Sequence, residues 1–481
     1  MTQIMKKLIT ATFVLAIIFS SVLLSPSCKK DQTSDNSNIN SDTTNNNSPS
    51  GTTYIEPSTQ RTGDAQKGYD FLVNGDYNWS GIPFSMFTGT TSVNELNRTG
   101  DNATVPFSYT VVTAKNGVKV TVPNCMTCHA SYLNGQFIMG LGNSMTDNTT
   151  NTSSTLALSD LLIQVKYGAS SPEWDAYSIF STVSKTVAPY IVTDCKGVNS
   201  ADRLFAILAA HRDPQSLQWS DTPISEIPNL GVIPTDVPAW WLLKKKNAMF
   251  YTALGQGDFA RIMMASALLT MEDSSDARYA DDHFADVYAY LNTIEAPAYP
   301  QSIDQTEADK GKTIFENNCS ACHGKYGTDE SYPNLLVQAN VVGTDSLLAY
   351  SYSAFSEYLN WFNNGWFGQA PHGAALVNTG GYVAPPLDGV WATAPYLHNG
   401  SVPTLEDLLN STERPVFWKR TFTDTDYDFT KIGWNYSVET SASSTAVYNT
   451  TLSGYGNSGH TFGDKLSSDE RTSLIEYLKT L

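Results

Sequence analysis

Two five-residue segments carry the residue types and the spacing of a haem-attachment site. Cys125–His129 and Cys319–His323 both read Cys-x-x-Cys-His. Two cysteines three positions apart can each form a thioether to a vinyl group of one porphyrin, and the adjoining histidine then lies beneath the iron as its proximal ligand. A disulfide or a zinc half-site could use the two cysteines but would not explain the histidine. The sequence therefore predicts two covalently bound haem c groups, with Cys125, Cys128, Cys319 and Cys322 as thioether cysteines and His129 and His323 as proximal ligands.

Each motif must be held by helices, and the sequence contains two copies of a segment that begins and ends with a helix. Residues 64–72 (DAQKGYDFL) parallel residues 307–315 (EADKGKTIF), and both resemble the N-terminal helix of a small cytochrome c. Each copy ends in an amphipathic helix, over 284–294 and 474–481, the latter preceded by a capping box of Ser467 and Glu470. Further helices are expected near residues 200–211, 238–251, 257–272 and 353–364.

The two copies differ in the segment that leads to the cysteines. In the second copy the cysteines follow the first helix at once, whereas a long segment intervenes in the first, with a hairpin expected around residues 115–117. We therefore expect a mostly α fold of two cytochrome-c-like haem domains with long loops and a short hairpin insertion. The domains are predicted over residues 61–300 and 301–481, divided at a proline-containing segment, and the size of the chain allows each a core of its own.

The N-terminus predicts export. Residues 1–28 resemble a bacterial lipoprotein signal, in which two lysines precede an apolar run over 8–24 and Cys28 carries the lipid. An uncleaved anchor helix is the alternative. Both interpretations place the protein in the cell envelope, in the periplasm or at the cell surface. Residues 29–60 are rich in Asn, Ser, Thr and Asp, and we expect a disordered tether there.

The charge balance narrows the partners. The chain has a net charge of −18 and no basic block, which argues against nucleic acid and favours steering of a cationic electron-donor protein. Of the six cysteines, four belong to the haem motifs and Cys28 to the signal. Cys195 is then most simply a lone structural thiol.

Residues 381–409 read GYVAPPLDGVWATAPYLHNGSVPTLEDLL. This segment resembles the signature of the bacterial di-haem cytochrome c peroxidase and MauG superfamily, above all its rubber-oxygenase-like branch, and residues 209–219 and 236–251 are also similar to that branch. The resemblance spans roughly residues 64–481. It implies two cytochrome-c-like domains that face each other, with one haem for chemistry and one for electron transfer. Calcium between the domains, as in related peroxidases, is left open, because no EF-hand-like loop is present.

The sixth ligand decides what each haem can do, since a strong protein ligand favours electron transfer and an open site allows peroxide or dioxygen to bind. His372, His398 and His460 are the candidates in the second domain. His460 precedes the last helix, where the rubber-oxygenase-like branch has a histidine, so the resemblance implies a bis-histidine, electron-transferring haem. The alternative for His460 and for His372 is a place on the surface. His398 could instead line the inter-haem interface or have a structural role in its loop.

The His129 haem is then the reactive one. His211, beside Arg212, could supply a base and a cation to a peroxide, or could bond haem propionates or cap a helix. Trp241, or its neighbour Trp240, lies where the superfamily tends to place a tryptophan between its haems, although a core position explains it nearly as well. We also expect that methionines could serve as haem ligands and that Phe250 and Phe259 could form walls of the haem pocket. The methionines concerned are Met139, Met145, Met263, Met264 and Met271.

The sequence interpretation is an exported, lipid-anchored di-haem c oxidoreductase. A small donor protein, a cytochrome or a cupredoxin, would pass electrons to the haem held by His323 and His460. Electrons would cross near Trp241 and Tyr396 and reduce peroxide at the His129 haem. A haem dioxygenase acting on an apolar substrate and a non-enzymatic electron-transfer cytochrome are the two alternatives.

Overall fold

Two helix pairs form the repeated frame that the sequence predicts. In the first half, α2 (Ala65–Asn74) packs on α8 (Ser274–Leu291), and in the second half α9 (Gln305–Asn318) packs on α15 (Ser468–Leu478). The carboxylates of Asp64 and Asp304 accept hydrogen bonds from the first backbone amides of α2 and α9, which fixes where these helices begin. The predicted capping box of Ser467 and Glu470 at the start of α15 is confirmed.

A glycine brings the helices of each pair into close contact. A Cβ at Gly68 would lie 1.9 Å from the carbonyl oxygen of Asp286, and one at Gly311 would lie 1.9 Å from that of Ser473. Only a residue without a side chain fits between the two backbones at these points. The same device at equivalent positions of the two frames supports the internal repeat.

The computed structural model describes residues 49–87 and 93–481. The predicted signal and the lipidated Cys28 lie outside the described residues. None of the helices in the described part of the chain has the length and apolar content needed to cross a bilayer. The remaining α-helices are α3 (Met126–His129), α4 (Ser153–Tyr167), α5 (Pro172–Val187), α6 (Ala201–Ala210), α7 (Phe259–Met263), α10 (Ser320–His323), α11 (Ala339–Val342), α12 (Leu347–Ser351), α13 (Ser356–Asn364) and α14 (Leu405–Leu408).

Short strands form several small sheets between the helices, so the expectation of a mostly α fold is confirmed only in part. Helices account for 38% of the described residues and strands for 14%. The strands are β1 (Thr52–Tyr54), β2 (Ile82–Pro83), β3 (Tyr109–Thr113), β4 (Lys119–Pro123), β5 (Ala130–Leu133), β6 (Gln136–Met139), β7 (Gly255–Gly257), β8 (Leu335–Gln338), β9 (Ala374–Leu376), β10 (Gly381–Val383), β11 (Phe417–Lys419), β12 (Tyr427–Asp428), β13 (Gly433–Trp434), β14 (Ser437–Val438) and β15 (Val447–Asn449).

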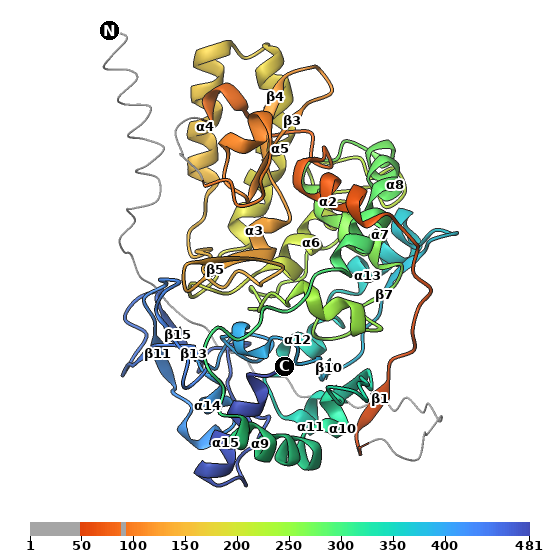
Figure 1. Cartoon of the computed structure of the whole chain (residues 1–481). Coiled ribbons are helices and arrows are strands. Elements are labelled where there is room, and N and C mark those ends of the chain that lie inside the picture. Colours follow the sequence, from red (N-terminus) through yellow and green to blue (C-terminus); the bar gives the residue numbers. More distant parts are fainter. Residues whose placement is uncertain (1–48, 88–92) are drawn as a thin grey trace. The chain divides into compact units, whose positions relative to one another are not determined.

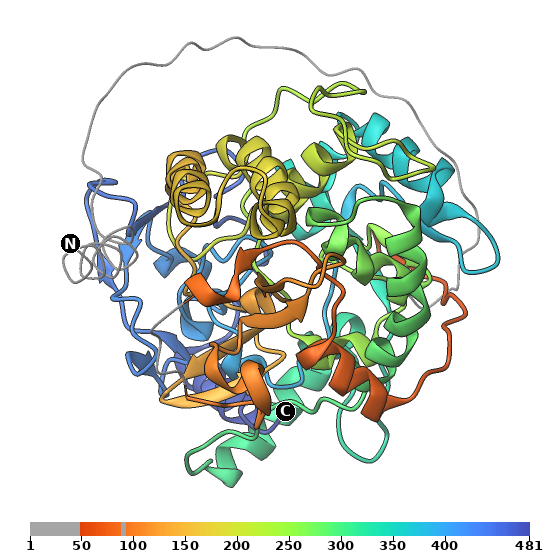
Figure 2. The same cartoon turned by 90° about the horizontal axis from the view of Figure 1, so that it is seen from above.

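The insertion in the first half is larger than a hairpin. The predicted hairpin is confirmed as β3 and β4, joined around Gly117 at a φ of 86°. After the haem motif, β5 and β6, the first half also contains an antiparallel pair of helices, α4 and α5, that the sequence interpretation did not include. Figures 1 and 2 show these two helices side by side.

Two expectations about local structure are corrected. The predicted tether over 29–60 ends before Thr52, because β1 pairs with β8 and Ile55 is buried at 7% exposure. The segment 238–251 is helical only over Trp240–Lys245, as a 3-10 helix. The backbone is extended at Lys246, so that Asn247 can bond Asn334 and the Ile55 carbonyl.

Both large hydrophobic cores draw side chains from both predicted haem domains. The first core unites α2, α6 and α8 with residues from 339 to 382, and the second unites α15 and residues 390–409 with Leu133, Leu141 and Trp241. Residues 49–481 form one unit. The boundary at 300/301 stays a prediction, and the two halves share their cores across it.

Candidate functional site

The second haem motif follows directly from α9. The Cys319 carbonyl accepts hydrogen bonds from the amides of Cys322 (3.1 Å) and His323 (3.0 Å), so one turn of backbone fixes both sulfurs and the imidazole. His323 Nδ1 lies 2.8 Å from the Pro385 carbonyl oxygen. This contact places the proton on Nδ1 and leaves Nε2 free to bind a metal ion.

A second imidazole faces His323 at the distance expected for a shared metal ion. The ring centres of His323 and His460 lie 6.2 Å apart, with an interplanar angle of 63°. Two imidazoles on opposite sides of one ion would have ring centres about 6.4 Å apart, given a bond of about 2.0 Å and about 1.2 Å from nitrogen to ring centre on each side. His323 and His460 could therefore hold one haem iron between them.

The loop that carries His460 is held in a conformation with local backbone strain. His460 has a φ of 45°, in the left-handed region, and its amide donates to the Val342 carbonyl at 2.7 Å. A Cβ at Gly459 would lie 2.1 Å from the carbonyl carbon of Gly343, so glycine is required there. The Asp345 carboxylate also accepts from two amides of the loop at 3.1 Å. Strain of this kind persists only where surrounding contacts impose it.

Arg414 is the main anchor of this loop. Its buried guanidinium donates to the carbonyls of Asn457 (2.7 Å), Gly459 (2.7 Å) and His460 (3.1 Å). On its other side it donates to the carbonyls of Asp407 and Leu408 at the end of α14. The planar, rigid donor fork of arginine suits such a set of carbonyls. Sequence reasoning missed Arg414, because nothing about a single arginine indicates which loop it will bind.

Burial keeps the imidazoles of this pair neutral. It lowers the pKa of His323 and lowers the pKa of His460 to about 3, with the charges of His323 and Arg414 adding to the effect on His460. Neutral imidazole is the form that binds a metal ion.

The first motif has a different environment. One helical turn again joins Cys125 and His129, whose amide donates to the Cys125 carbonyl at 3.1 Å. The His129 ring stacks on Trp240, with ring centres 4.8 Å apart and an interplanar angle of 17°. Burial lowers its pKa to about 4, an effect partly offset by the nearby Pro238 carbonyl. Within the described residues, no second histidine ring packs against His129 as His460 does against His323.

The chemistry of the cysteines fits thioether attachment. In the described part of the chain, all four motif cysteines are free of disulfides. Cys128 Sγ lies 3.7 Å from the Asn199 side-chain nitrogen. Cys195 is 2% exposed, and burial raises the pKa of its thiol to about 12, which agrees with the predicted structural thiol.

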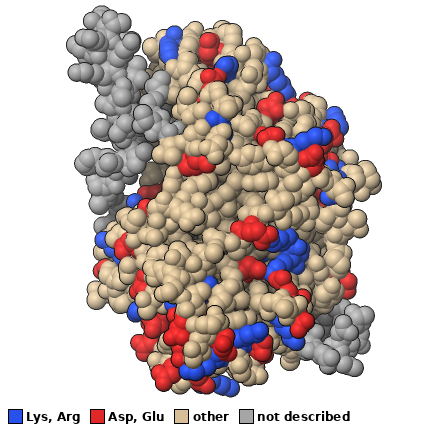
Figure 3. All heavy atoms as spheres, viewed as in Figure 1, with Lys and Arg blue, Asp and Glu red and all other residues tan. Residues whose placement is uncertain are grey.

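The two motifs also differ in exposure. No residue from 120 to 133 is exposed, whereas residues 316–318 and Ala321 at the second motif are exposed. Acidic side chains gather on the surface near α9 and α15 (Figure 3). The exposed carboxylates there include Asp304, Asp309, Glu316, Asp469 and Glu470.

The two adjacent tryptophans have separate environments. Trp240 contacts His129, and Trp241 is fully buried in the second core, where its Nε1 donates to the Asp388 carbonyl at 2.8 Å. Asp388 lies three residues after Pro385, whose carbonyl bonds His323. The sequence interpretation considered either tryptophan for an inter-haem position. In the structure Trp240 contacts the motif histidine His129, and Trp241 bonds the segment that follows Pro385.

The side chains of His211 and Arg212 contact backbone carbonyls near their own helix end. His211 Nδ1 lies 2.8 Å from the Ser220 carbonyl, and its ring stacks on Trp219. Arg212 is fully buried and donates to the carbonyls of Leu217 and Leu268. Among the described residues, no hydrogen bond or ring contact joins His211 to His129. These partners favour the helix-end role that the sequence left open.

Tyr396, His398 and His372 do not join the histidine pair. The Tyr396 hydroxyl lies 3.2 Å from the carbonyls of Val390 and Ile432, which ties the 390–396 loop to the residue that precedes β13. His398 is buried against Tyr382, with Nε2 3.1 Å from its hydroxyl, and His372 is exposed.

The remaining expectations around the haems are tested less directly. The Met139 sulfur accepts from the Tyr290 hydroxyl at 3.3 Å, and Met264 and Met271 are fully buried core residues. Phe259 belongs to the core near the first motif. Among the described residues, no group of three or more His, Cys, Asp and Glu side chains is placed to share a metal ion. Calcium also binds carbonyl and amide oxygens, so calcium stays a prediction.

Comparisons with known protein families match the second half of the chain. Residues 308–376 match the cytochrome c family, and residues 381–419 match a family described as RoxA-like, cytochrome c-like. The first match includes Cys319–His323. The chain thus contains cytochrome c and is related to the RoxA-like branch, which implies covalently bound haem c and a haem-based electron-transfer or oxidoreductase role.

Two relatives from Sinorhizobium fredii (strain NBRC 101917 / NGR234) are similar to parts of the chain. The uncharacterized protein y4iM is 29% identical over 312 residues, which is 56% of this chain and 69% of that protein. The uncharacterized protein y4iJ is 41% identical over 111 residues, which is 21% of this chain and only 18% of that protein.

Proposed function

We propose that this protein is an exported di-haem c oxidoreductase that takes up electrons at the second motif and reduces peroxide at the first. The observation that carries the proposal is the asymmetry of the two histidines: His323 has an opposing imidazole at 6.2 Å, and His129 has none among the described residues. A haem iron with two histidine ligands suits electron transfer, and one with an open side can activate peroxide or dioxygen.

The chain's own residues would orient both proximal ligands. The Pro385 carbonyl holds the Nδ1 proton of His323, and Arg414 holds the loop of His460. At the first motif, Trp240 fixes the plane of the His129 ring by stacking. Each contact limits the movement of a ligand when the charge on the iron changes, which lowers the reorganisation that electron transfer requires.

A continuous run of contacts supports transfer between the two sites. It leads from His129 to the stacked Trp240, along the peptide to Trp241, and through the Nε1 hydrogen bond to Asp388. The backbone then reaches Pro385, which bonds His323. Tyr396 packs in the same core as Trp241, where its part is to support the loop.

Surface properties support electron entry at the second motif. Its neighbourhood is exposed and acidic, whereas no residue from 120 to 133 around the first motif is exposed. A small cationic donor, a cytochrome or a cupredoxin, would be steered to this acidic face. Attachment of the protein to a membrane through a lipidated Cys28 remains part of the proposal, and mass spectrometry of the mature N-terminus tests it.

A haem dioxygenase acting on an apolar substrate is the second candidate. Two observations favour it. One is the match of residues 381–419 to the RoxA-like family, and the other is that the carbonyls of Leu217 and Leu268 engage Arg212, the expected cation of a peroxidase. An apolar pocket at the first motif would protect bound dioxygen from protonation.

Spectroscopy and turnover separate these functions. Electron paramagnetic resonance of the purified holoprotein should show one low-spin bis-histidine haem and one haem with an open or weakly held site. Peroxide turnover with a reduced donor would favour the peroxidase, and oxygen-dependent cleavage of an apolar substrate would favour the dioxygenase. Two firmly six-coordinate haems without either response would leave the non-enzymatic cytochrome.

The ligand assignment has its own test. His460→Ala should convert the second haem from low to high spin, because no other histidine among the described residues faces His323. His372→Ala is the matched control, since His372 is exposed. An unchanged spectrum of His460→Ala would mean that another residue is the sixth ligand.

A further inference from the structure

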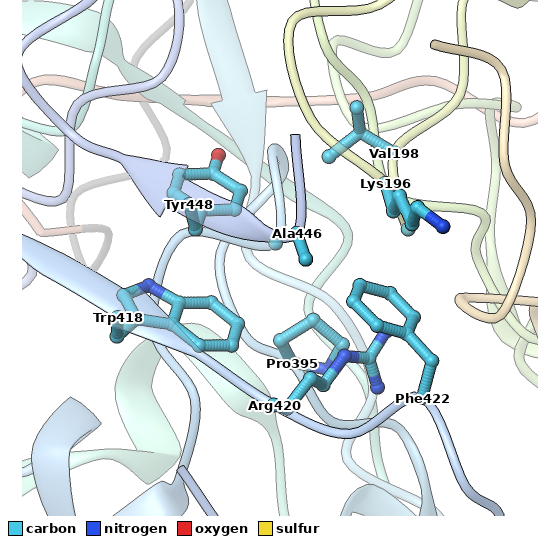
Figure 4. Close-up of a pocket in the computed structure, with 10 residues that line it drawn as sticks. Lys196, Val198, Pro395, Trp418, Arg420, Phe422, Ala446 and Tyr448 are labelled. Atoms are coloured by element: carbon cyan, nitrogen blue, oxygen red, sulfur yellow. The ribbon is translucent and has the colours of Figure 1, made fainter. Parts of the chain in front are cut away.

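A small cavity with a buried arginine lies outside the histidine sites. Its walls come from four segments that are distant in the sequence: residues 196–198, residues 395–400, β11 with Phe422, and β15 (Figure 4). Its volume is about 10 Å³, which is room for one water-sized group. Trp418 and Tyr448 stack on each other along one side, at a ring-centre distance of 5.3 Å.

Arg420 lines this cavity, and one nitrogen of its guanidinium has no acceptor among the described protein atoms. Its side chain is 4% exposed. One terminal nitrogen, Nη2, donates to the Ser144 carbonyl, while the other, Nη1, is buried and has no acceptor among the described protein atoms. Within the described part of the chain, no carboxylate lies within 4 Å of this guanidinium to form an ion pair. The carboxylate of Asp236, which raises the pKa of Arg420 from a greater distance, is bonded by Tyr251.

Aromatic rings fix the orientation of the guanidinium. Its carbon lies 4.4 Å from the ring centre of Phe422 and 4.6 Å from that of Trp434. These contacts hold the cation by its ring-facing surface and leave its in-plane N–H groups to find acceptors. Burial lowers the pKa of Arg420 to about 9, so the group is still charged at neutral pH.

A buried charge with one hydrogen bond carries an uncompensated desolvation cost. We propose that Arg420 binds a small anion in this cavity, a halide or one oxygen of a carboxylate, through Nη1. The apolar walls formed by Pro395, Val198 and Ala446 exclude a larger or more strongly hydrated ion such as phosphate. The cavity size agrees with a single atom of the ligand entering beside Arg420.

Two sources could present such an anion. One is a free anion from solution. The other is the propionate of a haem at the first motif, which lies close to Arg420 in space. Arg420 donates to the Ser144 carbonyl, and the amide of the neighbouring Asn143 donates to the Cys128 carbonyl at 2.8 Å. The second source rests on the proposed haem at Cys125–His129, and the pyridine haemochrome assay of haem content tests that premise separately.

The test compares full-length holoprotein variants in chloride and in formate, with ionic strength held constant by sodium gluconate, a bulky anion. Arg420→Gln removes the charge, and Ala446→Leu fills the cavity while keeping Arg420. Lys419→Gln is the control, because Lys419 is an exposed cation next in sequence. The readouts are the thermal unfolding midpoint and the resonance Raman bands of the haem propionates.

If a free anion binds, the thermal unfolding midpoint should rise to saturation with anion concentration in the wild type and in Lys419→Gln. This rise should be absent in Ala446→Leu and in Arg420→Gln. If a haem propionate binds instead, the unfolding midpoint should not respond to added anions. The propionate bands should then shift in both cavity variants while two haems are still bound. The proposal is overturned if both variants keep the wild-type response to anions. It is also overturned if no protein responds and the propionate bands stay unchanged.

Discussion

Single side chains give the two motif histidines different partners. His460 faces His323, and the contacts that impose its left-handed backbone come from Arg414, Val342 and Gly343. His129 instead has the flat face of Trp240 against its ring. At this scale, the proposed division between electron transfer and catalysis depends on one histidine and on the residues that orient it.

Removal of the Arg414 guanidinium should loosen the His460 ligand. Arg414→Met leaves carbonyls of the loop and of α14 without donors, so we expect a free energy of unfolding lower by about 2–4 kcal/mol. We also expect a high-spin fraction at the second haem, restored to low spin by added imidazole. Arg471→Met is the control, since Arg471 makes a single bond, to the Leu466 carbonyl. Equal spectra for the two variants would limit Arg414 to a structural role.

Asp236 should make stability depend on pH. Burial raises its pKa to about 7, although hydrogen bonds from Tyr251 and a backbone amide partly offset this shift. The folded state therefore holds a proton that the unfolded chain releases near pH 4, and stability falls as the pH rises from about 4 to about 7. Urea titrations of the holoprotein should give a smaller decline from pH 5 to pH 8 in Asp236→Asn than in wild type. Asp329→Asn, at an exposed position, should keep the wild-type slope.

At the scale of elements, the two helix pairs are the frame on which the motifs depend. α9 leads straight into the second motif, and α15 holds α9 in place. In the first half, β2, β3 and β4 lie between α2 and the motif, and α4 and α5 follow the motif, yet α2 and α8 still meet at a glycine. The helix pair is therefore retained while the connection between helix and haem motif varies.

Gly311→Ala should separate α9 from α15. The added methyl group would overlap the Ser473 carbonyl oxygen. We expect a loss of about 2–4 kcal/mol in the free energy of unfolding, despite the gain of about 1 kcal/mol in helix propensity. Gly231→Ala is the control, because a Cβ there meets nothing within 4 Å. Chemical denaturation of both holoproteins measures the difference, and similar midpoints would contradict the close contact.

At the scale of residues 49–481, the two halves are joined by shared cores and by the Trp240–Trp241 pair. Trp241 from the first half lies among residues 390–409 of the second, and residues 339–382 of the second half complete the core of the first. Such interlocking gives a fixed geometry between the two motifs. A fixed geometry is what a constant rate of electron transfer between them requires.

Trp241→Phe should slow the transfer of electrons between the two motifs. Phenylalanine keeps most of the packing but loses the hydrogen bond to the Asp388 carbonyl, at a cost of about 1 kcal/mol in stability. Rapid mixing with a reduced donor would follow the second haem and then the first. Trp418→Phe loses a similar buried bond, to Ser401, outside the proposed route. Equal inter-haem rates in the two variants would exclude Trp241 from the route.

Much of the frame could be predicted because its signals are local. The hairpin at Gly117, the capping box at Ser467 and the repeat of α2 in α9 each depend on neighbours within a few residues. The helices α4 and α5 were not among the predicted segments. The length expected for the 238–251 helix was wrong, because Asn247 pairs with Asn334 and Ile55 far along the chain.

The sequence by itself determined the haem chemistry, because two cysteines and a histidine on one helical turn need no distant partner to define an attachment site. Tertiary structure decided which side chains lie against each motif histidine. It brought His460 to His323, gave Trp240 and Trp241 different neighbours, used His211 and Arg212 within their own loop, and left Arg420 at a cavity. These contacts join residues that lie far apart in the chain, and only the packing of the cores determines which of them meet.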